Sequence, residues 1–406
     1  MNYGKISLIG AVLLTAFVSA CSKKDPITDN EKPEEPKVYY WASVSAGQSH
    51  ALALSEEGGI YVWGLNSEGQ LGTNSTANVA KPILLNNGTK WTNAITGYEH
   101  TLAIAEDGSL WAWGKNDVGQ LGLNSDENRI LTPTRVGAAT DWAQIAVGGN
   151  YSLALKKDGT LWSWGSHSNG SIGNGQSSGN TKTPTQVGSD KDWEKIYAFN
   201  NWGASFAIKK DGTLWAWGKA QNYMLGTGST TNQLTPIQVG TDKKWKTLAS
   251  DRSRNTFAIA SDGTLWGVGR NNKGLLQQGN TISQQSFVQI GTDSDWENIA
   301  TFNLTFLASK KDGTLYGWGS NTYGELGNGV VNSTSSDELA TKTITKIEGI
   351  TGVKQIAMGF NFSLLLKENS KSICIAGSNI SGIPSLGTGN PASDPISKHQ
   401  CDITLF

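Results

Sequence analysis

Short segments in which bulky apolar residues alternate with small or polar ones recur along most of the chain. In Leu110–Gly114 the two tryptophans are two residues apart, so both point to one side of an extended strand. The preceding residues 106–108, Glu-Asp-Gly, are a tight-turn signal because Asp-Gly tolerates a positive φ. An apolar run at 102–104 comes before that turn. The pattern predicts an antiparallel pair of strands joined by a hairpin.

Two further strands complete the same unit. Residues 91–95 predict a strand that breaks at the turn 97–100. A loop over 115–122 leads to a short fourth strand near 133–136. Four antiparallel strands of this length form one blade of a propeller.

The run Trp/Tyr-x-Trp-Gly, or a degraded form of it, returns seven times at steps of 50, 51, 53, 51, 50 and 58 residues. Its closing glycines are Gly64, Gly114, Gly165, Gly218, Gly269, Gly319 and Gly377. A period near 50 with strand-like content is typical of a closed array. We therefore predict an all-β, seven-bladed β-propeller of four-stranded repeats over residues 39–406. The seventh copy has Cys374 and Ala376 in place of the aromatic residues, which suits a terminal blade.

Charge and reactive side chains exclude several classes of function. The 406 residues carry 33 basic and 34 acidic side chains, so nucleic acid is not an expected partner. The histidines and cysteines lack metal-ligand spacing, and no nucleophile elbow or phosphate-binding loop stands out. We expect a monomer without enzymatic activity, metal or cofactor; a lyase or hydrolase at the channel mouth is the least favoured alternative.

The N-terminal residues 1–20 read as a signal peptide, with a basic start and an apolar stretch from Ile6 to Val18. The run Val18–Cys21 resembles a bacterial lipobox, which implies that Cys21 is lipidated. Residues 21–38 then form a charged, proline-containing tether. We expect a protein that is anchored to the outer membrane by its lipid alone and displayed on the cell surface. An ordinary secretory signal with an incidental cysteine is the alternative.

Two more cysteines, Cys374 and Cys401, fall in the last repeat of a chain predicted to leave the reducing cytoplasm. A disulfide that staples the last strand and two independent buried thiols are both compatible with this spacing.

The motifs of the first repeat carry a family resemblance. Residues 47–54 (Gly-Gln-Ser-His-Ala-Leu-Ala-Leu), 61–66 and 69–72 (Gly-Gln-Leu-Gly) resemble the regulator of chromosome condensation repeat, and the likeness extends over about 40–406. The resemblance implies a seven-bladed propeller. Its eukaryotic namesake acts on a nuclear GTPase and on chromatin, which an exported lipoprotein would not meet. A more distant likeness to propeller-type β-lactamase inhibitor proteins implies that one face grips a protein.

The alternating strand direction sorts the connections onto two faces. The "loop face" holds the turns between first and second strands and the loops between third and fourth strands. The "turn face" holds the Lys-Asp-Gly turns, such as 156–159, and the links between repeats. The turn face is repetitive and mixed in charge, as expected of a solvated surface.

Turns of the loop face vary where the scaffold does not. Fifteen of the sixteen tryptophans occupy repeat positions, and the exception, Trp202, lies in an unusually long turn. Large aromatic and arginine side chains dominate binding hot spots. The predicted binding residues are Tyr98, Glu99, Tyr151, Trp202, Asp251, Arg252, Arg254, Phe302, Asn303 and Phe360.

Two of the aromatic positions have a second interpretation. Tyr151 and Phe362 stand in register with His50 and His100, so they could instead pack into the channel. The two histidines are expected to brace their turns.

These features favour a surface-displayed propeller that binds a protein through blades four to six. The alternative is a glycan-binding lipoprotein, because the amide-flanked aromatic at 200–202 suits a sugar platform.

Overall fold

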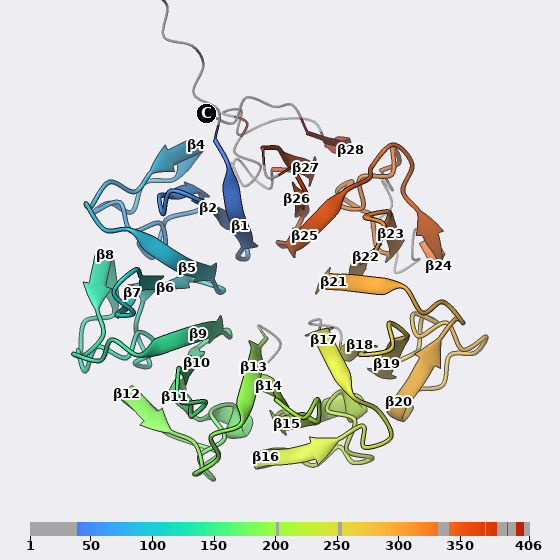
Figure 1. Cartoon of the computed structure of the whole chain (residues 1–406), viewed down its shortest axis with the longest axis horizontal. Coiled ribbons are helices and arrows are strands. Elements are labelled where there is room, and N and C mark those ends of the chain that lie inside the picture. The colour runs from blue at the N-terminus through green and yellow to red at the C-terminus, as the bar shows by residue number, and fades with distance from the viewer. Residues whose placement is uncertain are drawn as a thin grey trace, which may run out of the picture. The chain divides into compact units, whose positions relative to one another are not determined.

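The computed structural model describes residues 39–199, 203–250, 254–331, 341–369, 371–379, 388 and 395–401. The described part of the compact unit Tyr39–Phe406 is a ring of seven four-stranded antiparallel sheets (Figure 1). Each sheet takes its strands in chain order, which confirms the predicted propeller. The predicted signal peptide and tether, 1–38, lie outside the described residues, as do Trp202, Asp251 and Arg252.

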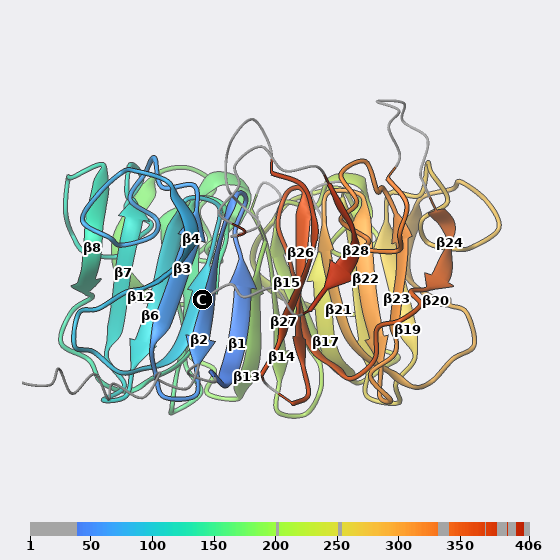
Figure 2. The same ribbon diagram turned by 90° about the horizontal axis from the view of Figure 1, so that it is seen from above.

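The strands run roughly along the ring axis, seen edge-on in Figure 2. The innermost are β1 (Trp41–Ala46), β5 (Trp91–Thr96), β9 (Trp142–Val147), β13 (Trp193–Ala198), β17 (Trp245–Ser250), β21 (Trp296–Phe302) and β25 (Val353–Met358). The second strands are β2 (His50–Ser55), β6 (His100–Ala105), β10 (Tyr151–Lys156), β14 (Ala204–Lys209), β18 (Asn255–Ala260), β22 (Thr305–Lys310) and β26 (Phe362–Lys367).

The third strands carry the repeat motif: β3 (Ile60–Gly64), β7 (Leu110–Lys115), β11 (Leu161–Ser166), β15 (Leu214–Gly218), β19 (Leu265–Gly269), β23 (Leu315–Gly319) and β27 (Ile373–Gly377). The outer strands are β4 (Val79–Leu84), β8 (Arg129–Arg135), β12 (Asn180–Gln186), β16 (Gln233–Val239), β20 (Gln284–Ile290), β24 (Thr341–Lys346) and β28 (Ile396–Gln400). Single 3₁₀ turns, η1 (Ser168–Gly170) and η2 (Gln221–Tyr223), interrupt two loops.

Two element boundaries of the second repeat differ from the sequence prediction. His100 is the first residue of β6 and pairs with Gly114, rather than lying in the turn. The outer strand β8 begins at Arg129, four residues before the predicted start. Both differences arise because backbone pairing with β7 extends beyond the apolar residues that mark a strand in sequence.

Neighbouring blades are bonded through a buried backbone carbonyl. The carbonyl of Gln120, in the loop after β7, accepts hydrogen bonds from Ser152 Oγ and from Trp164 Nε1, both at 2.8 Å. Both donors belong to the next blade and are fully buried. The arrangement recurs at two other boundaries. Thr101 and Trp113 donate to Gln70 O, and Ser205 and Trp217 donate to Ser171 O. At two further boundaries the hydroxyl is the donor without an indole. Thr256 Oγ1 donates to Met224 O, and Ser363 Oγ donates to Glu325 O.

The fifth and sixth blades meet through aromatic packing instead. Phe306 occupies the position of the donor hydroxyl in blade six. Its ring stacks on Trp318 with centroids 5.2 Å apart and lies 4.6 Å from Phe257 of blade five. Apolar area therefore replaces a hydrogen bond at this boundary.

Ring closure between blades seven and one uses side chains rather than an exchanged strand. Gln355 Oε1 accepts from Val44 N at 3.1 Å, and Gln355 Nε2 donates to Val44 O at 3.0 Å. On the loop face, Phe360 N donates to Gln48 O. A core cluster that includes Trp41 and Leu364 fills the space between the two blades. Among the described residues, sheet seven consists of β25 to β28, and no strand from the N-terminal side joins it.

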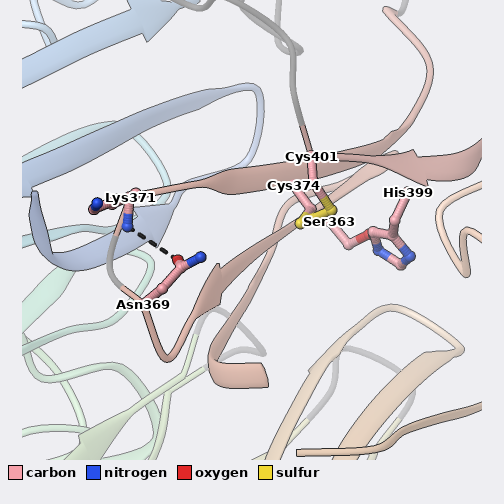
Figure 3. The surroundings of a disulfide bond; sticks show 6 residues. All are labelled: Ser363, Asn369, Lys371, Cys374, His399 and Cys401. Atoms are coloured by element: carbon pink, nitrogen blue, oxygen red, sulfur yellow. Dashed lines mark hydrogen bonds between the residues drawn. A yellow bond between two sulfur atoms is a disulfide. The ribbon is translucent and has the colours of Figure 1, made fainter. Parts of the chain in front are cut away.

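A disulfide holds the end of the last described strand. Cys374 lies in β27 and Cys401 directly follows β28, and Figure 3 shows the bond between them. Beside it, His399 Nε2 and Ser363 Oγ are 3.0 Å apart. The structure therefore shows the disulfide and not the alternative of two independent buried thiols.

We expect Gln355→Ala to lower the free energy of unfolding by about 2 kcal/mol, because both backbone groups of Val44 lose their partner at the closing boundary. Urea denaturation followed by tryptophan fluorescence measures the change. Gln144→Ala is the matched control, since Gln144 Oε1 makes a single such bond, to Ile196 N, and should cost about 1 kcal/mol. Equal effects of the two variants would show that closure does not depend on the Gln355 amide.

Candidate functional site

The channel at the ring centre opens among the variable turns. It encloses about 350 Å³ and is lined by residues of all seven innermost strands. Hydroxyl and amide side chains such as Ser43, Asn93 and Gln355 alternate with small aliphatic ones, and the lining contains no charged side chain among the described residues. Such a channel offers little chemistry of its own, and the groups suited to binding lie at its loop-face mouth.

Aromatic rings gather at this mouth over blades six and seven. Phe302 ends β21, is 7% exposed and lines the channel. Its centroid lies 6.0 Å from that of half-buried Phe360, which lies 6.3 Å from Tyr323. Phe199, at the end of blade four's innermost strand, also lines the channel. Phe302 therefore belongs to the channel wall, where its ring packs against Phe360, whereas Phe360 keeps part of its surface accessible.

Tyr151 is likewise part of the core rather than of the loop face. It is 2% exposed, and its hydroxyl donates to Ala204 O at 2.7 Å. The same hydroxyl accepts from Ser205 Oγ at 2.9 Å, and burial raises its pKa. The small Ala204 in blade four leaves the room that the ring needs. This corrects the prediction of Tyr151 as a binding residue in favour of its packing alternative.

Blade two presents a partly exposed turn that carries Tyr98 and Glu99. Glu99 Oε2 accepts from Lys115 Nζ at 2.8 Å, which ties the turn to the end of β7. Asn303 forms the corresponding turn of blade six with φ at +53°, in the left-handed region that Asn tolerates. These three residues do lie on the loop face.

Cationic side chains gather over blades four and five. Arg254, at φ +76°, donates from Nη1 to Asn222 Oδ1 at 3.3 Å. Arg270 N donates to Arg254 O, so the two arginines follow adjoining backbone. Burial, and then the charge of Arg254, lowers the pKa of Lys219. The loops 219–232 and 270–283 contain no carboxylate.

The first two blades have the opposite composition on the same face. Their loops carry the acidic residues Glu68, Glu99, Asp117, Asp126 and Glu127 beside Lys115 and Arg129. Among the described loop residues, most acidic side chains thus belong to blades one and two, whereas the side chains over blades four and five are cationic.

The charged side chains of the turn face make specific contacts with one another and with aromatic rings, which the expectation of a solvated surface did not include. Lys209 Nζ lies 4.8 Å from the ring of Trp193 and 4.6 Å from that of Trp215, and it pairs with Asp190 and Asp192. Lys156 and Lys310 are held in the same way between two rings and incoming carboxylates. These repeated contacts hold each blade's turn against the link that precedes that blade, so the charges are used within the scaffold.

Groups suited to catalysis or metal binding do not assemble in the described part of the chain. No cluster of three or more His, Cys, Asp or Glu residues is positioned to hold a metal ion there. Glu325, on the loop-face side of blade six, accepts from Thr305 Oγ1 and Tyr323 N, and burial raises its pKa. The described residues include no helix long and apolar enough to cross a membrane.

The turn histidines are buried in the scaffold. His100 Nε2 lies 3.0 Å from Ser152 Oγ of the next blade. His50 is fully buried, and neither of its ring nitrogens bonds to a described residue. Burial, and then the charge of His100, lowers the pKa of His50 to about 3.

Sequence reasoning missed several loop-face residues. Lys219, Arg270, Tyr223 and Tyr323 lie in the loops between third and fourth strands, where the first two repeats have the motif Gly-Gln-Leu-Gly. The available signal was a departure from that motif: blade four has Tyr223-Met224 in place of Gly-Gln.

Comparison with known proteins gives matches over most of the chain. Residues 19–253, more than half of the chain, match the RCC1-like domain, and residues 312–366 match the regulator of chromosome condensation (RCC1) repeat. The ultraviolet-B receptor UVR8 of Arabidopsis thaliana is 28% identical over 302 residues, which cover 70% of this chain and 66% of the receptor. The E3 ubiquitin-protein ligase HERC2 of Mus musculus is 31% identical over 250 residues, which cover 60% of this chain and 5% of the ligase. The chain thus spans just under two thirds of the first relative and a small part of the second.

Solved structures agree on the architecture. Prp20p of Saccharomyces cerevisiae superposes with a TM-score of 0.72 at 23% identity, over 90% of this chain and 87% of Prp20p. Human WBSCR16 gives 0.68 at 22% identity, over 79% and 84% of the two chains. At these identities the likeness shows the fold alone.

We expect His50→Phe to flatten the dependence of stability on pH. The unfolded chain binds a proton at His50 below about pH 6.5, whereas the folded protein binds it only near pH 3. Stability from this residue is therefore complete above pH 6.5 and is lost as the pH falls, by about 2 kcal/mol between pH 7.5 and 5. Phe is compatible with the site because Phe362 holds the same register in blade seven.

Unfolding in urea at the two pH values measures this difference. Phe362→Leu is the control, since it perturbs the same register without removing a titrating group, and its effect should be equal at both pH values. An unchanged pH slope in His50→Phe would contradict the burial argument.

Proposed function

Because the chain belongs to the family of RCC1-like domains, we propose that it is a non-enzymatic propeller that binds a protein partner through its loop face. The observation that carries the proposal is the contrast between the two faces. On the turn face, the lysines and tryptophans bind one another in a repeated pattern. On the loop face, aromatic and cationic side chains change from blade to blade and stay partly accessible.

The accessible groups are of the kind that protein interfaces use. Phe360 and Tyr323 provide aromatic area over blades six and seven, and Arg254 and Arg270 provide guanidinium groups over blade five. Aromatic and arginine anchors within a mixed polar surface dominate the binding energy of such interfaces. This combination favours a protein over a glycan at the loop face, since a glycan site needs flat aromatic platforms flanked by amides.

Related propellers support a role in protein binding. Yeast Prp20p is described with binding properties to Gsp1p and histones, and yeast RCC1 (Prp20) has been solved with Kap60 bound. We carry over only the general role, because the identities of 22–23% reach no further than the fold. We therefore assign none of these partners to this chain.

The absence of enzymatic activity remains part of the proposal. On the loop face, the carboxylate of Glu99 is engaged by Lys115 and that of Glu325 is buried against Thr305. Neither carboxylate is a poised acid or base beside an open cavity, as hydrolytic chemistry would require.

We further propose that the propeller is exported and tethered to the outer membrane through lipid on Cys21, with display on the cell surface. The basic, apolar and small-residue order of 1–21 supports this, as does the charged segment 22–37. The disulfide of Cys374 and Cys401 fits an oxidising compartment.

We expect combined Arg254→Ala and Arg270→Ala changes, and separately Phe360→Ala, to reduce partner capture by about tenfold or more, because each removes an interface anchor. Capture is measured by cross-linking the full chain to host envelope proteins and quantifying the adduct. Lys157→Ala with Lys244→Ala, two exposed changes on the turn face, is the control and should leave capture unchanged. Capture that survives the loop-face changes, or a glycan array that responds to them instead, would overturn the protein-binding assignment.

We expect Cys21→Ser to release the protein from the membrane fraction, because the thiol is the proposed lipid attachment point. Fractionation followed by immunoblotting measures the distribution, and metabolic labelling with an alkyne fatty acid measures the acylation. Cys374→Ser is the control, since it leaves the N-terminal cysteine intact and should stay with the membrane. Membrane association of Cys21→Ser would refute the lipid anchor.

A further inference from the structure

The boundary between blades four and five departs from the repeat. At three other boundaries a loop glycine lies against the indole of the next blade: Gly72 on Trp113, Gly122 on Trp164 and Gly173 on Trp217. Blade five has Val268 at this register. Gly226 lies instead against Phe287, which comes from the outer strand β20.

Phe287 also departs from its own register. The corresponding outer-strand residues of blades two, three and four are Pro133, Pro184 and Pro236. The ring of Phe287 lies 4.8 Å from that of Trp245, which lies 6.2 Å from Trp266. The third ring of the boundary cluster therefore comes from the edge of the blade rather than from its third strand.

A groove of about 360 Å³ lies at this boundary. Trp266 and Phe287 contribute aromatic surface, and both are partly exposed. Gln238, Thr241, Asp242 and Lys243 contribute polar side chains from the end of β16 and the link to β17. This volume is at the lower end of the range of small-molecule sites.

We propose that this lateral groove binds a neutral sugar unit, a pyranose of a glycan. The C–H faces of a pyranose pack on aromatic rings, and its hydroxyls bond to amide, hydroxyl and carboxylate groups; the lining supplies both kinds of surface side by side. The groove is separate from the loop face, so the proposal does not depend on the partner assigned there.

The lining argues against other ligand classes. A purely apolar ligand would make no use of the polar side chains of Gln238, Thr241 and Asp242. An anion would meet Asp242, and the ammonium of Lys243 is already engaged by Asp262 at 3.0 Å. A cation would meet Lys243, whose Nζ lies 5.2 Å above the ring of Trp266. A neutral polyhydroxylated ring brings no charge into the groove, and it packs on the parts of Trp266 and Phe287 that stay exposed.

The test uses saturation-transfer NMR and fluorescence titration of the full chain with methyl pyranosides of glucose, galactose, mannose, xylose and N-acetylglucosamine. We expect saturable binding of at least one pyranoside, with a Kd in the millimolar range usual for so small a ligand. No saturable binding by any of them overturns the proposal.

Trp266→Ala should weaken binding by about tenfold, because it removes the aromatic wall. Trp162→Ala is the matched control: Trp162 holds the same register in blade three and does not line the groove, so binding should be unchanged. Gln238→Ala, at an exposed position, tests the polar side without endangering the fold and should weaken binding several-fold.

The double change Val268→Trp and Phe287→Pro restores the pattern of blades two to four and should close the groove while keeping the fold. We expect it to abolish pyranoside binding and to leave capture of the loop-face partner unchanged. Binding that persists in this variant, or that is lost equally in Trp162→Ala, would overturn the assignment. Loss of loop-face capture in the Arg254 and Arg270 variant alone would bear on the proposed function and not on this groove.

Discussion

The ring depends on a backbone carbonyl that no blade can satisfy by itself. In the loop after the third strand, the carbonyl of Gln70, Gln120 or Ser171 is buried against the next blade, and only that blade's hydroxyl and indole reach it. A buried carbonyl without a partner is costly, so at these boundaries each blade is stabilised by its successor. Small residues and tryptophans recur at fixed positions for this reason, and the seven sheets fold as one array rather than as independent units.

Closure of the ring follows from the same requirement. Blade seven has lost the aromatic pair of the repeat, and Cys374 stands in its third strand. The amide of Gln355 and the backbone of Phe360 reach across to blade one, while the disulfide holds the last described strand onto its sheet. Directional bonds at the seam thus take the place of an exchanged strand.

Because most blade boundaries are held by these hydrogen bonds and rings, residues at the edges of the blades can differ from repeat to repeat. The turn face is bound into the scaffold by lysines held between rings, whereas the loop face carries divided charge and partly exposed aromatic residues. The boundary of blades four and five varies in another manner, since Val268 replaces an indole and Phe287 moves in from the edge. Variation along this chain therefore changes both the loop face and one boundary between blades.

The sequence alone determined the architecture, because strand period, turn residues and the 50-residue repeat are local features that each blade expresses independently. It also placed Tyr98, Glu99, Asn303 and Phe360 on the loop face, since strand alternation assigns every turn to one side. It could not decide which aromatic residues point outward. Tyr151 is buried because Ala204 of the next blade leaves room for it and offers its carbonyl, and Phe302 is buried because Phe360 covers it. The pairing of Cys374 with Cys401 and the groove beside Phe287 likewise depend on distances between segments far apart in the chain. A periodic pattern gives the side of the strand, but the neighbouring blade decides whether there is space, and that space exists only in the assembled ring.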